Sequence, residues 1–306
     1  YSNILIIKMS SLGDVIHALP TLYALRQNLP HAKITWAIHE QFASLLPGTP
    51  WVDEVIIIDK KQLKSPSYLW NLRKELHSRH FDMTLDLQCI AKSAIVSLLS
   101  GAPEKYGYWE LREGSQLVNK ALVGAHKYDH VIERYLDTIR ALGGEVDGVE
   151  FPMPHDHVAE GAIRNRLSEL GVTDDYVVVV PGARWIIKEW PLLNFGELCI
   201  RLCESGKKVV IAGSPDDAEK GQFIENYVKS DNLINLVGQT TMAELIELIR
   251  HCHIFVSADT GPLHIANALK KPLIALFGTT SPHRTGPYGG SHVHLIISPT
   301  SKATPE

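Results

Sequence analysis

Two aspartates stand where an apolar, strand-like run gives way to a helix. Asp14 follows Ile4 to Lys8 and a Ser/Gly loop and precedes a helix predicted from Val15 to about Asn28, and Asp259 follows Ile254 to Ala258. Ligands of parallel α/β sheets are bound at such carboxyl ends of strands. For Asp14 the alternatives are helix capping and general-base catalysis. For Asp259 they are capping and ligand binding, and the local pattern leaves both pairs open.

The residues after Asp259 suit an anionic ligand. Gly261 permits close backbone approach or a positive φ, and Pro262 suits a first helical turn, so the N–H groups beyond it can point at an anion. A short helix from Leu263 to Leu269 and a strand from Leu273 to Phe277 follow. The segment therefore predicts a βαβ unit whose binding edge includes Asp259.

Cations stand in a third loop of this kind. The most apolar run, Tyr176 to Val180, leads into a long loop that carries Arg184 and Lys188, and a helix from Leu192 to Glu204 follows. Cations beside a helix N-terminus suit a diphosphate. The alternative is that both are ordinary surface residues.

Further candidates follow other strands. After the strand Lys208 to Ala212, a carboxylate could accept hydrogen bonds from ribose hydroxyls, although helix caps would look the same. The acidic residues there are Asp216, Asp217 and Glu219. After the strand Met83 to Leu87, Lys92 opens the next helix and is a candidate by position. No G-x-G-x-x-G or G-K-[ST] motif is present, which disfavours a dinucleotide fingerprint and a P-loop.

The elements that must position these residues alternate between strand and helix along the whole chain. Such alternation predicts parallel sheets with helices on both faces. The run Glu145 to His157 holds prolines and charges without periodicity, as a linker does. We therefore expect two domains, residues 1–150 and 151–306.

Composition is that of a globular enzyme. The 306 residues suffice for two domains, and the formal charge of −4 shows no nucleic-acid footprint. No apolar run is long enough for a membrane span and no signal-peptide pattern is present, so a cytoplasmic protein is expected. The four cysteines lack CxxC spacing and are expected to be buried thiols rather than metal ligands.

With these pieces assembled, the sequence resembles the lipopolysaccharide heptosyltransferases, the inverting glycosyltransferases of family 9, and among them the heptosyltransferase I members. The main motifs are Lys8 to Pro20, KMSSLGDVIHALP, and Val256 to His264, VSADTGPLH. Shorter matches lie in both halves: Leu87-Gln88 with Lys92-Ser93, Gly107 to Arg112, His130 to Arg134, and Lys188 with Trp190-Pro191.

The resemblance implies a GT-B architecture, in which two Rossmann-like, doubly wound parallel-sheet domains face each other across a cleft and no metal or other cofactor is required. It implies that Asp14 is the general base and that Lys188 binds the leaving diphosphate. The other donor-binding residues implied are Arg184, Asp217 for the ribose, Asp259 for the heptose hydroxyls, Thr260 and Gly261 for the phosphates, and His264. The acceptor-binding residues implied are Ser11, Gly13, Lys92, Arg112 and His130.

The partners implied are ADP-heptose as donor and a Kdo-type sugar on lipid A as acceptor. A monomer in peripheral contact with the cytoplasmic face of the inner membrane is expected, with no nucleic-acid partner. Two departures from the family pattern are present: Trp185-Ile186-Ile187 precede Lys188, and the chain ends at Glu306, where the family usually adds a C-terminal helix. Another nucleotide-sugar glycosyltransferase and a non-catalytic nucleotide-sugar binding protein are the alternative functions.

Overall fold

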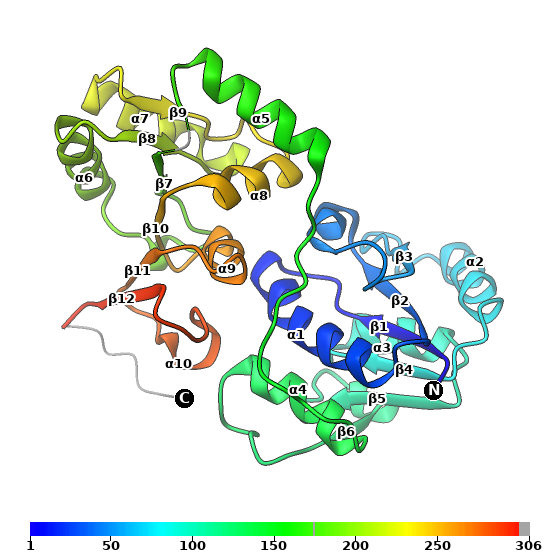
Figure 1. Cartoon of the computed structure of the whole chain (residues 1–306). Coiled ribbons are helices and arrows are strands. Elements are labelled where there is room, and N and C mark those ends of the chain that lie inside the picture. Colours follow the sequence, from blue (N-terminus) through cyan, green and yellow to red (C-terminus); the bar gives the residue numbers. More distant parts are fainter. Residues whose placement is uncertain (174, 300–306) are drawn as a thin grey trace. The chain divides into compact units, whose positions relative to one another are not determined.

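The computed structural model describes residues 1–173 and 175–299 and divides the chain into two compact units (Figure 1). The N-terminal unit is Tyr1–Pro154 and the C-terminal unit is His155–Glu306. Each unit contains one six-stranded sheet in which all neighbouring strands are parallel. The predicted pair of doubly wound parallel-sheet domains is thus confirmed.

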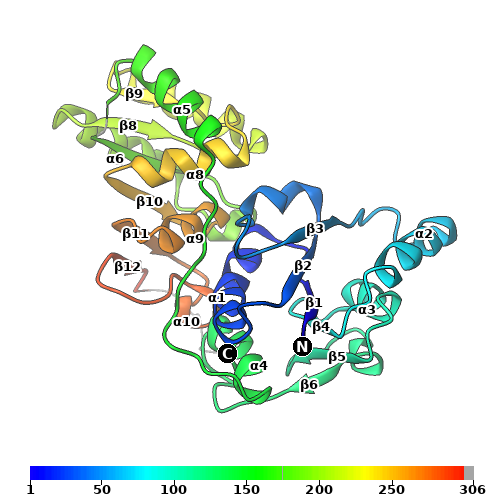
Figure 2. The same ribbon diagram turned by 45° about the vertical axis from the view of Figure 1, so that its right-hand side comes forward.

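The N-terminal sheet has the strand order β3-β2-β1-β4-β5-β6. Helices α1 and α4 cover one face and α2 and α3 the other (Figures 1 and 2). The strands are β1 Asn3–Ile7, β2 Lys33–Ile38, β3 Glu54–Ile57, β4 Met83–Asp86, β5 Glu104–Tyr108 and β6 Lys120–Leu122. The helices are α1 Leu12–Asn28, α2 Pro66–His77, α3 Ala91–Leu99 and α4 Val131–Ala141, with 3₁₀ turns at Glu40–Leu45 and Ser115–Leu117.

The C-terminal sheet repeats this topology in the order β12-β11-β10-β7-β8-β9. Helices α5, α8 and α9 cover one face, and α6 and α7 cover the other (Figures 1 and 2). The strands are β7 Tyr176–Val180, β8 Lys208–Ile211, β9 Leu233–Asn235, β10 Ile254–Ala258, β11 Leu273–Phe277 and β12 Val293–Ile297. The helices are α5 His157–Glu169, α6 Leu192–Glu204, α7 Ala218–Val228, α8 Met242–His251, α9 Gly261–Ala268 and α10 Pro282–Thr285, with 3₁₀ turns at Ile186–Lys188 and Pro215–Asp217.

The central strands are buried on both faces, which is why they read as continuous apolar runs. All five residues of β7 are buried, and β-branched valines suit such a strand. On one face of the C-terminal sheet, Phe195, Cys199 and Cys203 of α6 pack with Ile224 of α7 against the strands. All four cysteines of the chain are free and buried, as predicted.

Chain order reverses at one point in each sheet, between β1 and β4 and between β7 and β10. Ligands of open α/β sheets are bound outside the carboxyl ends of the strands at such a switch point. The segments that follow these four strands hold Asp14, in the first turn of α1, and Gln88, Lys188 and Asp259. The topology therefore assigns one candidate binding edge to each unit.

One prediction about the elements was wrong, and two strands were missed. The helix expected from Val15 begins at Leu12, so Gly13 and Asp14 lie inside its first turn. Strands β5 and β6 were not predicted; β5 is only partly buried and contains a glycine, and β6 has three residues. Among the helices that the structure describes, none has the length and apolar character to cross a bilayer.

Candidate functional site

The first turn of α1 places Asp14 at the edge of the N-terminal sheet. Ser11, not Asp14, is the N-cap residue, and Asp14 is the third helical residue. Its Oδ2 accepts hydrogen bonds from the backbone N–H of Ser11 at 3.1 Å and from the Ser11 hydroxyl at 2.6 Å. The capping hypothesis for Asp14 is therefore corrected: its carboxylate supports the helix start from within the helix. Asp14 is half-buried, as are Ser11 and Gly13.

One helical turn beyond Asp14, His17 meets a second histidine, His130. His17 of α1 and His130, the N-cap of α4, are both buried, and their rings meet edge to face with centroids 5.5 Å apart. The Nδ1 of His130 accepts a hydrogen bond from the backbone N–H of Ile132 at 3.2 Å. The proton of a neutral His130 is therefore on Nε2, which makes that atom a hydrogen-bond donor.

The loop between β4 and α3 meets the loop after β1. The side-chain oxygen of Gln88 accepts hydrogen bonds from the backbone N–H groups of Met9, at 3.1 Å, and Ser10, at 3.4 Å. Lys92 lies exposed in the first turn of α3. Gln88 thus joins the two loops of the switch point, and Lys92 adds a solvent-facing cation to the same edge.

Arg112 is brought to this edge by backbone contacts. Its N–H donates to the carbonyl of Cys89 at 3.0 Å, and the Ser115 hydroxyl donates to the same carbonyl at 3.2 Å. The Arg112 side chain is exposed. The carboxylate of Glu113 accepts a hydrogen bond from the backbone N–H of Ala91 at 3.3 Å, so an anion already meets the N-terminus of α3.

Buried Asp86 holds this edge together. Its carboxylate accepts hydrogen bonds from the backbone N–H groups of Gln88 and Cys89, the Ser93 hydroxyl and the Asn119 amide, at 2.8–2.9 Å. Burial raises the pKa of Asp86 to about 6, against the opposing effect of these hydrogen bonds. A single carboxylate therefore fixes the turn that presents Gln88 and the start of α3.

We expect Asp86→Ala to destabilise the protein by roughly 3 kcal/mol or more, because several buried donors lose their acceptor at about 1–3 kcal/mol each. Urea unfolding of both proteins measures the difference. Asp82→Ala is the matched control, since the hydrogen bonds it accepts from Ser2 are exposed, the one from Asn3 is only partly buried, and water can replace them. A loss for Asp86→Ala no greater than for Asp82→Ala would contradict this role.

In the C-terminal unit, Lys188 and Asp259 form one contact at the switch point. The Lys188 ammonium lies 2.8 Å from Asp259 Oδ2, and the Thr280 hydroxyl donates to the same oxygen at 3.0 Å. The Asp259 side chain is 9% exposed and that of Lys188 is 28% exposed. Lys188 is therefore not an ordinary solvated surface residue. We call Lys188, Asp259 and Thr280 the β7/β10 cluster.

The start of α9 lies beside this cluster. The capping hypothesis for Asp259 is wrong, because Thr260 is the N-cap and the Asp259 carboxylate is engaged by Lys188 and Thr280. Gly261 is the first helical residue, and Pro262 follows it in the first turn as predicted. His264 is buried one turn into the helix. The backbone geometry leaves the first turn of α9 suited to an anion.

Asp217 forms a second network of polar contacts in the loop after β8. Its carboxylate lies 3.0 Å from the Lys220 ammonium and accepts a hydrogen bond from the Ser214 hydroxyl at 3.3 Å. Lys220 also pairs with Glu189. A Cβ atom on Gly182 would lie 2.3 Å from the Asp217 carboxyl carbon, so only glycine lets Asp217 lie against the end of β7. Asp217 is thus held next to the first loop rather than acting as a side-chain helix cap.

Arg184 lies apart from these networks. It is exposed, and its guanidinium lies 5.7 Å from the Trp185 ring centre. The next residues, Ile186 and Ile187, are also exposed. The Thr279 hydroxyl donates to the Ile187 carbonyl at 2.7 Å and so ties the 3₁₀ turn of Lys188 to the loop after β11.

The loop after β11 was missed by the sequence-based candidates. Thr279 and Thr280 follow Gly278 directly after this strand, so the rule that selected Asp259 would also have selected them. Lys220 was missed because it lies inside α7, where a lysine reads as a solvated helix residue. The missed residues contact predicted site residues or the turn that carries them: Thr280 contacts Asp259, Thr279 contacts the turn of Lys188, and Lys220 contacts Asp217.

The chain is similar to known proteins over most of its length. Residues 69–306 match the profile of glycosyltransferase family 9 (heptosyltransferase). Lipopolysaccharide heptosyltransferase 1 of Pseudomonas aeruginosa is 29% identical, with 96% of this chain and 83% of that protein covered. Lipopolysaccharide heptosyltransferase 3 of Escherichia coli is 28% identical, with 88% and 80% covered.

Solved structures agree on the fold. The structure of ADP-heptose lps heptosyltransferase II of Escherichia coli superimposes with a TM-score of 0.81 and 26% identity, covering 98% of this chain and 92% of that one. Escherichia coli heptosyltransferase WaaC with ADP gives a TM-score of 0.79 at 24% identity, covering 97% and 93%. The second likeness concerns the fold alone.

Proposed function

Because this chain belongs to glycosyltransferase family 9, the heptosyltransferase family, we propose that it transfers a heptose from ADP-heptose to an anionic Kdo-type sugar of the lipopolysaccharide inner core. The transfer inverts the anomeric centre and needs no metal. Residues 1–150 bind the acceptor and residues 151–306 bind the donor. The enzyme acts as a monomer in the cytoplasm, at the inner membrane surface where its lipid-linked acceptor lies.

The observation that carries the donor side of this proposal is the 2.8 Å contact between Lys188 and Asp259 at the switch point of the C-terminal sheet. A diphosphate attracts the ammonium, and a sugar hydroxyl can donate to the carboxylate. The two groups are therefore positioned to bind the adjoining parts of one nucleotide sugar. The Escherichia coli relative named ADP-heptose lps heptosyltransferase II, which is 26% identical, supports the choice of donor.

Further groups complete the donor site. The backbone N–H groups of Thr260 and Gly261 hydrogen-bond the phosphates at the start of α9. Asp217 accepts hydrogen bonds from the ribose, since it is the carboxylate after the second strand of its unit. Arg184 adds positive charge from its exposed position, and buried His264 supports the first turn of α9 from within the helix.

On the acceptor side, Asp14 is the general base. The N-terminal edge offers exposed cations at Lys92 and Arg112 and a donor at His130 Nε2 for an anionic sugar. Ser11 orients the Asp14 carboxylate, and Gly13 keeps the first turn of α1 free of a side chain.

The reaction proposed is an in-line displacement. The acceptor oxygen attacks the anomeric carbon of the heptose, the bond from that carbon to the diphosphate oxygen breaks, and the electron pair leaves with ADP. Asp14 takes the proton of the attacking hydroxyl. Lys188 and the helix N-terminus stabilise the negative charge that develops on the leaving diphosphate. The chemistry requires the donor and acceptor to be brought together when both are bound.

We expect ADP to stabilise the full-length protein. A ligand present at 100 times its dissociation constant stabilises a protein by roughly 2.7 kcal/mol. Melting temperatures measured with ADP, UDP and GDP therefore show which nucleoside diphosphate binds most tightly. ADP should raise the melting temperature more than UDP or GDP at equal concentration. A larger shift with UDP or GDP would overturn the choice of ADP-heptose, and no shift with any of them would overturn nucleotide binding.

A further inference from the structure

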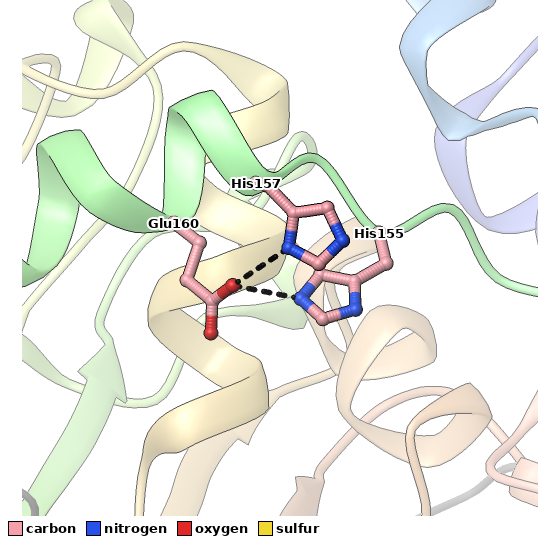
Figure 3. A group of neighbouring side chains, drawn as sticks. All are labelled: His155, His157 and Glu160. Atoms are coloured by element: carbon pink, nitrogen blue, oxygen red, sulfur yellow. Dashed lines mark hydrogen bonds and ion pairs between the residues drawn. The ribbon is translucent and has the colours of Figure 1, made fainter.

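A cluster of histidine and glutamate side chains lies at the beginning of the C-terminal unit, away from the β7/β10 cluster. His155 Nε2 and His157 Nδ1 approach the same oxygen of Glu160, at 2.9 and 3.3 Å (Figure 3). The two imidazole rings lie side by side with centroids 4.3 Å apart. Three potential metal-ligand atoms thus converge within 4.8 Å of one another.

The spacing suits a first coordination shell. Tetrahedral zinc with bonds of about 2.0–2.2 Å holds neighbouring ligand atoms about 3.3–3.6 Å apart. The 3.3 Å distance from His157 lies at the lower end of this range, and the 2.9 Å distance from His155 is shorter. A set of two histidines and one glutamate is a known zinc donor set with one position left open. Imidazole also suits copper, nickel and iron, whereas magnesium and calcium prefer oxygen ligands.

Two residues of α8, His251 and Glu247, contact the segment that carries the three candidate ligands. His251 Nε2 lies 2.7 Å from the other oxygen of Glu160 and so orients the carboxylate. Glu247, which is 1% exposed, accepts a hydrogen bond from the backbone N–H of Asp156, the residue between the two histidines. Partners of this kind fix the direction of metal ligands and contribute to metal affinity.

The cluster lies far from the donor-binding edge. His251 precedes Ile254, the first residue of β10, whereas Asp259 follows the last residue of that strand. The candidate metal ligands are therefore associated with the amino end of β10 and the β7/β10 cluster with its carboxyl end. A metal bound there would hold the start of α5, next to the end of α8, and take no part in transfer.

We propose that His155, His157 and Glu160 bind one divalent transition-metal ion of the zinc class, supported by Glu247 and His251. The bound ion stabilises the C-terminal unit by joining the segment that enters α5 to the first turn of that helix, whose Glu160 contacts His251 of α8. Because the unfolded chain lacks this preformed arrangement, the binding free energy adds to the stability of the folded protein.

The test uses untagged, full-length protein freed of metal with a chelator and then dialysed. Titration with zinc chloride, followed by calorimetry and elemental analysis, should show one zinc ion per chain and a higher melting temperature. His155→Ala with His157→Ala should weaken zinc binding by more than the roughly 10–100-fold typical for loss of a supporting partner, and Glu247→Gln should fall within that range.

His253→Ala is the matched control, because this exposed histidine lies two residues beyond His251 without belonging to the cluster. It should bind zinc as the parent does. Glu160→Gln provides an independent ligand variant if the double histidine variant does not fold. No stoichiometric zinc in the parent, or parent-like affinity in either ligand variant, would overturn the proposal.

Discussion

Asp14→Asn should leave the protein folded and able to bind ADP while lowering its turnover by about 10² or more, the loss usual for a missing general base. Asparagine keeps the size of aspartate and one oxygen that can accept the Ser11 hydrogen bonds, but it has no basic lone pair of comparable strength. The lost negative charge in the first turn of α1 costs about 0.3–1 kcal/mol of stability. Steady-state kinetics and melting temperatures of the same preparation separate these effects.

Asp82→Asn is the matched control for this change. Its carboxylate accepts hydrogen bonds from the backbone N–H and the hydroxyl of Ser2, at 2.6 and 2.8 Å, as Asp14 does from Ser11. Asp82 lies before the amino end of β4, so its loss should not affect turnover. If Asp14→Asn turns over like the parent, Asp14 serves only the helix start, and His17, one turn further along α1, is the next candidate base.

Lys188→Ala should lower turnover by roughly 10²–10³, about 2.7–4 kcal/mol of transition-state stabilisation, as expected for loss of one preorganised electrostatic donor. The charge that Lys188 stabilises grows as the diphosphate leaves, so the loss should fall mainly on kcat. The Thr280 hydroxyl still donates to Asp259 in this variant, which limits the effect on folding.

Lys207→Ala controls for the removal of a lysine. Its ammonium lies 3.5 Å from Asp175, its side chain is 43% exposed, and it precedes β8 at the amino end of the sheet. It should retain parent kinetics. An unchanged kcat in Lys188→Ala would show that the contact with Asp259 is only structural.

The alternation of strands and helices was predictable because buried parallel strands are apolar along their whole length. β7 and β10 show this pattern clearly. β6 does not, because this edge strand has three residues and only Leu122 is buried. Gly13 concealed the first turn of α1, since glycine reads as a helix breaker although it costs little at a helix start, where the N–H groups have no partner within the helix.

The candidate residues were predictable in position but not in their contacts. The carboxyl ends of β7 and β10 located Lys188 and Asp259 separately. Their ion pair depends on the conformation of the loop from Pro181 to Pro191, which the Thr279 hydrogen bond to Ile187 helps to set. A contact between residues some 70 positions apart through such a loop has no periodic signal in the sequence.

The most direct test of the proposed function is a transfer assay with ADP-heptose and a Kdo-lipid A acceptor, analysed by mass spectrometry and nuclear magnetic resonance. We predict an acceptor that gains one heptose with inverted anomeric configuration, together with release of ADP and without added divalent ions. Release of ADP without glycosylated acceptor, transfer from a different nucleotide sugar in preference, or a product with retained configuration would contradict the proposal.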